Sequence, residues 1–434
     1  MNQINKFFTW VWILYIPTCI LFYNRLPEVT DEVMTLILVY FALQKWNRAR
    51  ECKRIKDEYK AYLGIMLVFF LYSLVIKSNV FPGIIQDLIQ QLRPYLVFYS
   101  TYLLAPKLNE KQLNKITKVG VYGLIIFVGL NGAGYKTSYT GVETPIVAQA
   151  SLLCGLLYYM NHNVASKKAT RITILILSIG LISGKSKFFG EYVVALYVIF
   201  FLKKKLELNS LRTNAILVLL VTFSIIVSWE KFEAYYISGF EEEYMSEMEA
   251  RPAYYKTAVS IIFKDYFPLG SGLASFATAT CAKYYSPLYY KYGLNEIWGL
   301  QPTQPWFIAD AFYPTLAQFG FVGVCLFLTF WYRRYKEIYR ISELKYYKIA
   351  LLCMFAIFVE ATADTSYLSG KGMGYFMLMA MCMRQELYYK DNQRRIMAME
   401  AEQQALAEAE AQAETKAQEK EQTVEELSAS RSIT

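Results

Sequence analysis

The chain has 434 residues, of which 55% are hydrophobic and 17% aromatic, and its formal net charge is +9. Runs such as LGIMLVFFLYSLVI are apolar on every face, which excludes an ordinary soluble domain and favours membrane-spanning helices over a barrel of alternating strands. The basic residues are spread over many loops, so the charge does not indicate nucleic-acid binding.

The apolar runs predict an all-α polytopic membrane protein with about twelve transmembrane helices. The first run lacks a small-residue cleavage site, so we expect a retained helix and not a signal peptide. In chain order, the expected spans lie near residues 8–23, 30–44, 61–76, 94–105, 119–132, 143–160, 171–183, 189–202, 214–229, 308–332, 346–360 and 372–383.

Lysine and arginine recur in alternate loops, which sets the expected orientation. Because basic loops stay in the cytoplasm, and an even number of spans places both ends on one side, we expect both termini to be cytoplasmic. The six basic loops contain KWNRARECKRIKDEYK, PKLNEKQLNKITK, SKKATR, KKKLELNSLR, WYRRYKEIYRISELKYYK and RQELYYKDNQRR.

The expected domain organisation has two parts. Residues 1–395 form the transmembrane domain, with one large extracytoplasmic loop at 230–306 between spans 9 and 10. Its helical stretch AYYKTAVSIIFKDY, the turn FPLGSG and the segment WGLQPTQPW indicate that much of this loop is folded. Residues 396–434 form an Ala/Glu-rich cytoplasmic tail, either a solvated helix or disordered, with a coiled-coil role as an alternative.

Two lysines stand in the stretch SGKSKFFGE between two apolar runs. This predicts Lys185, Lys187 and Glu191 at the outer membrane boundary, where unpaired cations are costly. We expect the lysines to hold an anionic group such as a lipid-linked phosphate, with the glutamate orienting one of them. The alternative is that the lysines reach out to water and anchor the turn.

Other outward-facing charges extend this hypothesis. Arg93 and Arg251 each precede a proline and are expected at helix starts. Together with Lys187 they could bind a diphosphate, whereas the alternative for each is pairing with a nearby carboxylate. Asp310 is the candidate general base, and Asp364 lies in the last outer loop; capping or a salt bridge is the alternative for both.

Conventional cofactor and nucleotide motifs are absent from the sequence. The seven cysteines form no CxxC or Cys/His pattern, and the single histidine, His162, falls in a basic cytoplasmic loop. There is no P-loop, GxGxxG or GxSxG motif. The sequence therefore predicts neither a metal site nor a cofactor.

Three motifs resemble the O-antigen polymerase and O-antigen ligase superfamily of bacterial envelope proteins: SGKSKFFGEYVVAL, RPAYYKTAVSIIFKDYFPLGSGLASF and DAFYPTLAQFGFVGVCLF. The resemblance covers most of residues 90–385, with Lys187 at a family arginine position. It implies a metal-independent glycosyltransferase of the bacterial inner membrane that acts on undecaprenyl-diphosphate-linked oligosaccharide. A chain-length regulator or other polysaccharide assembly proteins are further implied partners.

Polymerase is favoured over ligase because ligases of this superfamily carry a histidine where this chain has Ala309 and Asp310. Three alternatives remain. They are a flippase for lipid-linked sugars, a metal-dependent glycosyltransferase that uses Glu28, Asp31 and Glu32, and a purely structural assembly role.

Overall fold

The computed structural model describes residues 2–21, 30–48, 52–132, 144–162, 166–206 and 249–431, with isolated residues between 210 and 233. All secondary-structure elements in these ranges are helices. The β-type pairing among the described residues is limited to one isolated bridge between Gln301 and Gln304. The predicted all-α class is therefore confirmed for the described part of the chain.

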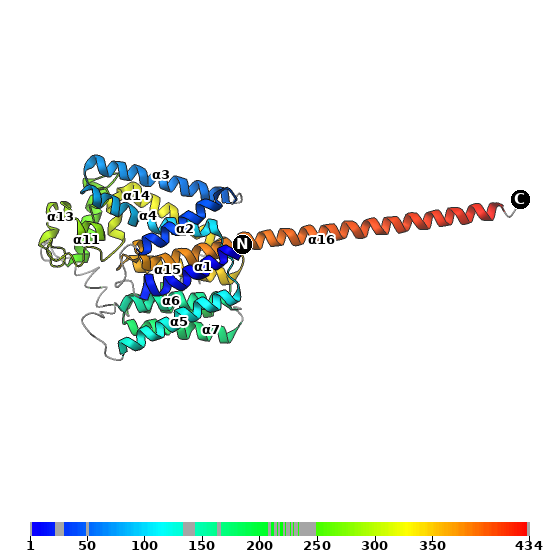
Figure 1. Ribbon diagram of the computed structural model, residues 1–434, viewed down its shortest axis with the longest axis horizontal. Helices are drawn as coiled ribbons and strands as arrows, with labels where there is room; N and C mark the ends of the chain where they lie inside the picture. Colours follow the sequence, from blue (N-terminus) through cyan, green and yellow to red (C-terminus); the bar gives the residue numbers. More distant parts are fainter. Residues whose placement is uncertain are drawn as a thin grey trace. The chain divides into compact units, whose positions relative to one another are not determined.

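Within residues Met1–Arg384 the long helices run side by side in a bundle (Figure 1). Short π or 3-10 stretches extend four of them: η1 (Ile16–Leu21), η3 (Trp46–Arg48), η5 (Gly180–Ser183) and η6 (Tyr197–Phe201). The long helices are α1 (Asn2–Tyr15), α2 (Thr30–Lys45), α3 (Lys53–Ile76), α4 (Phe81–Leu104), α5 (Glu110–Gly132), α6 (Thr144–Asn161), α7 (Lys167–Ile179), α8 (Ser186–Leu196), α14 (Gly320–Arg340), α15 (Leu344–Ala361) and α16 (Gly370–Arg431).

The chain divides into two compact units, Met1–Arg384 and Gln385–Thr434. Helix α16 crosses this division, which lies before the boundary predicted at residue 395. The second unit is helical as far as Arg431. Everything below concerns the first unit.

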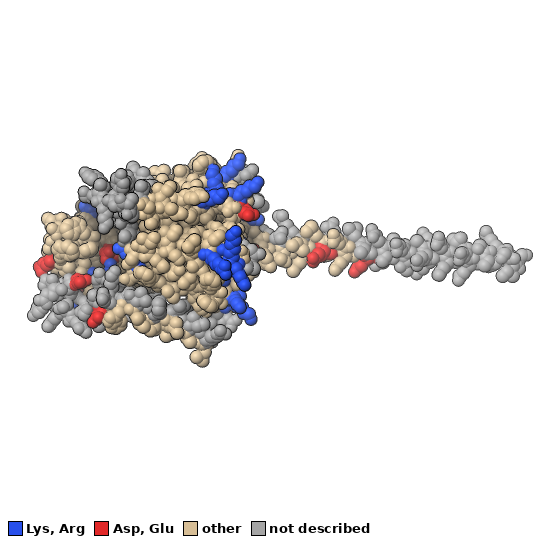
Figure 2. All heavy atoms as spheres, turned by 90° about the horizontal axis from the view of Figure 1, so that it is seen from below, with Lys and Arg blue, Asp and Glu red and all other residues tan. Residues whose placement is uncertain are grey.

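One end of the bundle is basic. Hydrogen bonds tie helix ends together there, such as Lys107 N to Asn5 Oδ1 (2.9 Å) and Lys45 Nζ to Leu104 O (2.7 Å). Figure 2 shows blue side chains gathered at one end of the bundle, which we call the basic end. Its exposed basic residues include Lys53, Arg54, Lys111, Lys167, Lys168, Lys203, Lys204, Arg333, Lys336 and Arg340.

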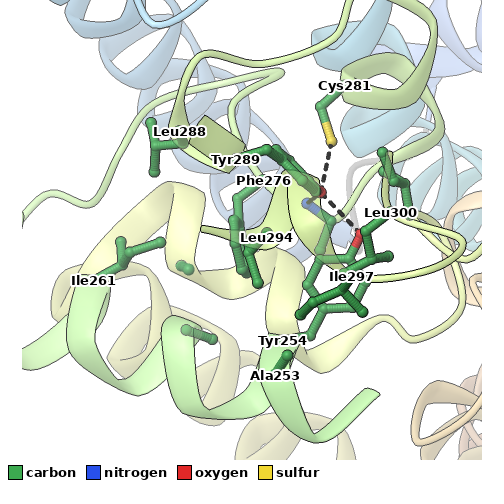
Figure 3. Close-up of a cluster of buried hydrophobic side chains, with 14 of the residues drawn as sticks. Ala253, Tyr254, Ile261, Phe276, Cys281, Leu288, Tyr289, Leu294, Ile297 and Leu300 are labelled. Atoms are coloured by element: carbon green, nitrogen blue, oxygen red, sulfur yellow. Dashed lines mark hydrogen bonds between the residues drawn. The ribbon is translucent and has the colours of Figure 1, made fainter. Parts of the chain in front are cut away.

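The opposite end, which we call the far end, carries a folded segment with short helices (Figure 1). Its core surrounds Tyr289, whose hydroxyl lies 3.0 Å from Tyr254 OH and 3.4 Å from Cys281 Sγ (Figure 3). The described part of the predicted 230–306 loop is thus folded around its own core. The elements are α11 (Ala250–Ser260), η9 (Ile261–Asp265), α12 (Ala279–Lys283), α13 (Leu288–Lys291), η10 (Leu294–Glu296) and η11 (Tyr313–Phe319).

The predicted FPLGSG turn attaches this segment to the bundle. Gly270 and Gly320 approach each other closely, so a Cβ at Gly270 would lie 2.3 Å from Gly320 N. Gly270 also has a φ of +82°, a backbone conformation that residues with a side chain rarely adopt. Backbone hydrogen bonds complete the junction, among them Gly272 N to Gln318 O at 2.9 Å. Two glycines from separate motifs therefore fix where α14 begins.

Among the described residues, two helical stretches are long and apolar enough to cross a membrane, Lys53–Ile76 and Tyr313–Arg340, and Ile146–Asn161 is a shorter apolar helix. This falls short of the predicted number of about twelve spans. Several described helices change pitch, because a π or 3-10 stretch extends them. Helix α4 carries buried polar groups. The span expected at 214–229 lies largely outside the described residues.

Candidate functional site

Distant elements meet at residues 362–371, which comprise the connection between α15 and α16 and the first two residues of α16. We call these residues the 362–371 segment. Phe312 stacks on Tyr367 within it, with ring centroids 3.9 Å apart. Hydrogen bonds reach this segment from α1, α4, α6 and the stretch before η11: Tyr15 OH to Gly370 O (3.0 Å), Arg93 Nη1 to Leu368 O (2.7 Å), Gln149 Nε2 to Ser366 Oγ (2.6 Å) and Thr365 Oγ1 to Ala309 O (3.1 Å).

Lys187 reaches this segment from the first turn of α8. Its ammonium pairs with Glu360, at the end of α15, and lies 3.5 Å from Asp364 Oδ2. Burial acts to raise the pKa of Asp364, but the charges of Lys187 and Lys371 and hydrogen bonds from Ser366 outweigh it and lower the pKa. The salt bridge considered as the alternative role of Asp364 is present.

Arg251 and Asp310 form a second ion pair beside the first. Arg251 lies in the first turn of α11, as the Arg-Pro pattern predicted. Burial raises the pKa of Asp310, and the adjacent guanidinium opposes this rise. Because the charges of Asp364 and Lys187 also act on Asp310, the two ion pairs form one electrostatic group. We call Lys187, Arg251, Asp310, Glu360 and Asp364 the paired-charge cluster.

Asp310 is the accessible member of this cluster. Its side chain is 35% exposed, against 2% for Glu360 and 16% for Asp364. Its position is fixed by its neighbours, since Phe312 N donates to Ala361 O at 3.0 Å. An incoming polar ligand would therefore meet Asp310 before it meets Glu360.

Arg93 contacts the other part of the 362–371 segment. Besides Leu368 O, it pairs with Asp31 Oδ2 at 2.6 Å and with Glu32, and its side chain is only 5% exposed. The expected helix start at Pro94 is wrong, because α4 begins at Phe81 and Pro94 lies inside it. A proline removes one backbone donor, which a helix stabilised by tertiary packing can tolerate.

One expectation for the SGKSKFFGE stretch needs correction. In this stretch α8 begins at Ser186, so Lys187 and Glu191 both lie on a helix. Glu191 is not the hydrogen-bonded partner of Lys187: it is 1% exposed, and neither carboxylate oxygen has a hydrogen-bond partner among the described residues. Lys185, just before α8, makes no ion pair with a described carboxylate.

The sequence reasoning did not find Glu360, the principal partner of Lys187. The available signal was an ionisable residue at the end of an otherwise apolar run, LLCMFAIFVE, which is unusual unless the side chain is paired. For the metal-dependent alternative, Glu28 lies outside the described residues, while Asp31 and Glu32 are both engaged by Arg93.

The arrangement has a clear chemical consequence. Lys187, Arg93 and Arg251 are each paired with a carboxylate. Pairing with a nearby carboxylate, the alternative to diphosphate binding, is therefore present at all three. An anion binding here must share or displace those carboxylates. The cations are preorganised by their partners, and the partially exposed Arg251–Asp310 pair is the most accessible point of exchange.

A cavity of about 440 Å³ lies elsewhere, at the basic end between α3 and α14. Its lining combines four basic residues with three acidic ones: Arg54, Arg333, Lys336, Arg340, Asp57, Glu58 and Glu337. The adjacent Arg334, which is fully buried, pairs with Glu58 at 2.5 Å. This cavity is separate from the residues predicted to bind the diphosphate.

No family model matches this sequence, and no curated protein matches it either.

Proposed function

We propose that this protein is a polymerase of bacterial surface polysaccharide, either O-antigen or exopolysaccharide. It transfers a glycan from undecaprenyl diphosphate to a lipid-linked repeat unit at the outer face of the cytoplasmic membrane. One observation carries the proposal: Lys187, Arg251 and Asp310, chosen for their chemistry, belong to one cluster at the far end of the bundle.

The proposed topology follows from the two ends. The exposed lysines and arginines of the basic end suit the cytoplasmic side, which leaves the far end outside. The proposal retains about twelve spans and cytoplasmic termini, as expected from the sequence. Helices too short for an ideal span would then meet a locally thinned bilayer.

In the proposed reaction, a sugar hydroxyl of the acceptor attacks the anomeric carbon of the donor glycan. The bond from that carbon to the diphosphate oxygen breaks as the glycosidic bond forms, and Asp310 accepts the hydroxyl proton. Undecaprenyl diphosphate departs with the negative charge, which Arg251 and Lys187 stabilise. The step requires no metal ion, because these two side chains supply the positive charge.

The ion pairs of the cluster fit a cycle of partner exchange. Before substrate arrives, Asp310 and Asp364 hold the two cations in place. When the diphosphate binds, Arg251 turns from Asp310 to the phosphate oxygens and frees the carboxylate to act as base. One movement thereby prepares both the leaving group and the proton acceptor.

Deletion of the gene followed by sizing of the surface glycan tests this function. Loss of a polymerase gives single-repeat products. Unattached long chains indicate a ligase instead, and lipid-linked units trapped at the inner face indicate a flippase. Complementation with Lys187→Ala should fail to restore chain growth. Lys291→Ala should restore it, because Lys291 is an exposed lysine of the far-end segment whose ammonium lies over the Tyr266 ring, outside the paired-charge cluster.

A further inference from the structure

Two tryptophans of the far-end segment are exposed side by side. Trp298 and Trp306 are 62% and 63% exposed, and their rings meet edge to face with centroids 5.7 Å apart. Single exposed apolar residues are ordinary, but a pair of large rings rimmed by polar groups is typical of a binding surface. The paired-charge cluster does not use either side chain.

The backbone that carries these rings is fixed. Residues 297–308 fold back on themselves through hydrogen bonds from Gln304 N to Gln301 O (3.0 Å) and from Phe307 N to Gly299 O (2.9 Å). Ile297, Leu300 and Ile308 point into the core and are at most 2% exposed. The two tryptophans therefore face outwards because their neighbours on the same turn are anchored inwards.

Gly299 adds to this rigidity. Its φ is +80°, and a Cβ there would lie 2.2 Å from the Phe307 ring. Phe307 in turn packs against Trp298, with ring centroids 5.3 Å apart. The surface is thus presented with little conformational freedom to lose on binding.

The chemistry of the turn favours a neutral ligand. Residues 297–309, IWGLQPTQPWFIA, contain no charged side chain, although Glu296 and Asp310 flank them. The polar side chains of this stretch are the amides of Gln301 and Gln304 and the hydroxyl of Thr303. A sugar ring matches this surface, because its C–H face can stack on an indole while its hydroxyls meet amides. Tryptophans that anchor a protein in a bilayer surface are commonly joined by lysine or arginine, which this stretch lacks.

The turn leads directly to the candidate base. Trp306 precedes Asp310 by four residues, so their Cα atoms are separated by at most about 14 Å. The intervening Ala309 is held to the 362–371 segment by Thr365 Oγ1, at 3.1 Å. A chain of sugars lying on the two rings would therefore lie within reach of Asp310.

We infer that Trp298 and Trp306 form a glycan-binding platform that holds the sugar chain of the lipid-linked substrate beside the paired-charge cluster. This inference rests on the proposed function. It adds a site for the uncharged part of the substrate, whereas the cluster binds the diphosphate and carries out transfer.

The test uses the full-length protein labelled with 5-fluorotryptophan in phosphatidylethanolamine/phosphatidylglycerol nanodiscs. The probe is the oligosaccharide released by mild acid from the lipid-linked units of the deletion strain. Among the seven tryptophans, the ¹⁹F resonances of Trp298 and Trp306, assigned by Trp→Phe substitution, should shift saturably. Trp10 on α1, which is 56% exposed, is the matched control and should not respond.

Variants separate the platform from the transfer site. Trp298→Ala with Trp306→Ala should weaken oligosaccharide binding about tenfold and shorten the glycan. Both side chains are more than half exposed, so thermal unfolding should change little, with the lost contact between Trp298 and Phe307 as the main effect. Lys187→Ala should retain oligosaccharide binding and lose chain growth.

The outcomes discriminate between the two ideas. If the oligosaccharide leaves both resonances unmoved while chain growth still depends on Lys187, the platform is wrong and the proposed function stands. If both resonances respond while Lys187→Ala keeps normal chain length, the platform stands and the polymerase proposal fails. Broadening of Trp298 and Trp306 by spin-labelled lipid, without a response to sugar, would identify a membrane anchor and overturn the inference.

Discussion

At the residue scale, the pair of Lys187 with Glu360 bears on stability and, under the proposed function, on chemistry. Glu360 is 2% exposed, so neither charge is well solvated without the other. Breaking a buried pair from one side leaves an uncompensated charge, whereas removing both charges is often close to neutral. This asymmetry allows the structural and functional roles of Lys187 to be separated.

Lys187→Met is therefore expected to destabilise the protein by about 3–5 kcal/mol and to stop chain growth. Lys187→Met with Glu360→Gln should recover most of the stability and none of the chain growth. Thermal unfolding in detergent and gel sizing of the glycan measure the two effects. Chain growth in the double variant would mean that Lys187 serves only to balance Glu360.

Asp310 gives a prediction for pH. In the proposed reaction Asp310 is the general base, which acts in its ionised form, and burial raises the pKa of this carboxyl group. Activity should therefore fall as pH decreases through a value above the ordinary aspartate pKa of about 4. In chain extension assayed with purified components, Asp310→Asn should abolish this acid limb along with most activity, whereas Asp265→Asn should not. An unchanged profile in Asp310→Asn would exclude the base role.

At the element scale, the junction between the far-end segment and α14 depends on glycine. Gly270 and Gly293 both have positive φ, +82° and +69°, and both lie in the same segment. Only the first is crowded: a Cβ at Gly270 would meet the backbone of Ala317 and Gly320, whereas a Cβ at Gly293 meets nothing within 4 Å. The two positions form a matched pair in which space alone differs.

Gly293→Ala should cost about 1–2 kcal/mol, the penalty for a side chain at positive φ. Gly270→Ala should cost clearly more, above about 3 kcal/mol, because backbone must also move. Unfolding followed by size-exclusion chromatography in detergent measures the difference. Equal losses would show that the turn does not pack on α14 as described.

Helix α4 is fastened to the same segment by Asp87. This carboxylate is fully buried and accepts a hydrogen bond from Ala274 N at 2.8 Å. The sequence pattern gave no indication of this contact, since Asp87 lies 187 residues from its partner. The beginning of α4 was missed for a related reason: Pro94 is a local signal for a helix start, but packing continues the helix back to Phe81.

At the scale of the whole molecule, the two ends of the bundle make the topology testable. Thr303 is exposed on the far-end turn, and Lys336 is exposed at the basic end. In intact cells with a permeabilised outer envelope, a membrane-impermeant maleimide should label Thr303→Cys, whereas Lys336→Cys should react only after lysis. Replacement of the exposed Cys325 lowers the background. Labelling of both positions from outside would contradict the proposed orientation.

The sequence by itself determined the helical class, the order of most long helices and the segregation of basic residues to one end. Hydropathy and charge are properties of local stretches, so they can be read without knowing the fold. The same reasoning selected Arg93, Lys187, Arg251 and Asp310 as chemically significant. It did not determine their partners.

Only the tertiary structure decided those partners. Lys187 meets Glu360 across 173 residues, and Arg93 meets Glu32 across 61. Such pairings depend on how each helix is rotated and how deeply it packs, and neither quantity is encoded in a short stretch of sequence. The tertiary structure also decided that Trp298 and Trp306 are exposed side by side. The burial of Ile297, Leu300 and Ile308 fixes the turn that carries the two tryptophans.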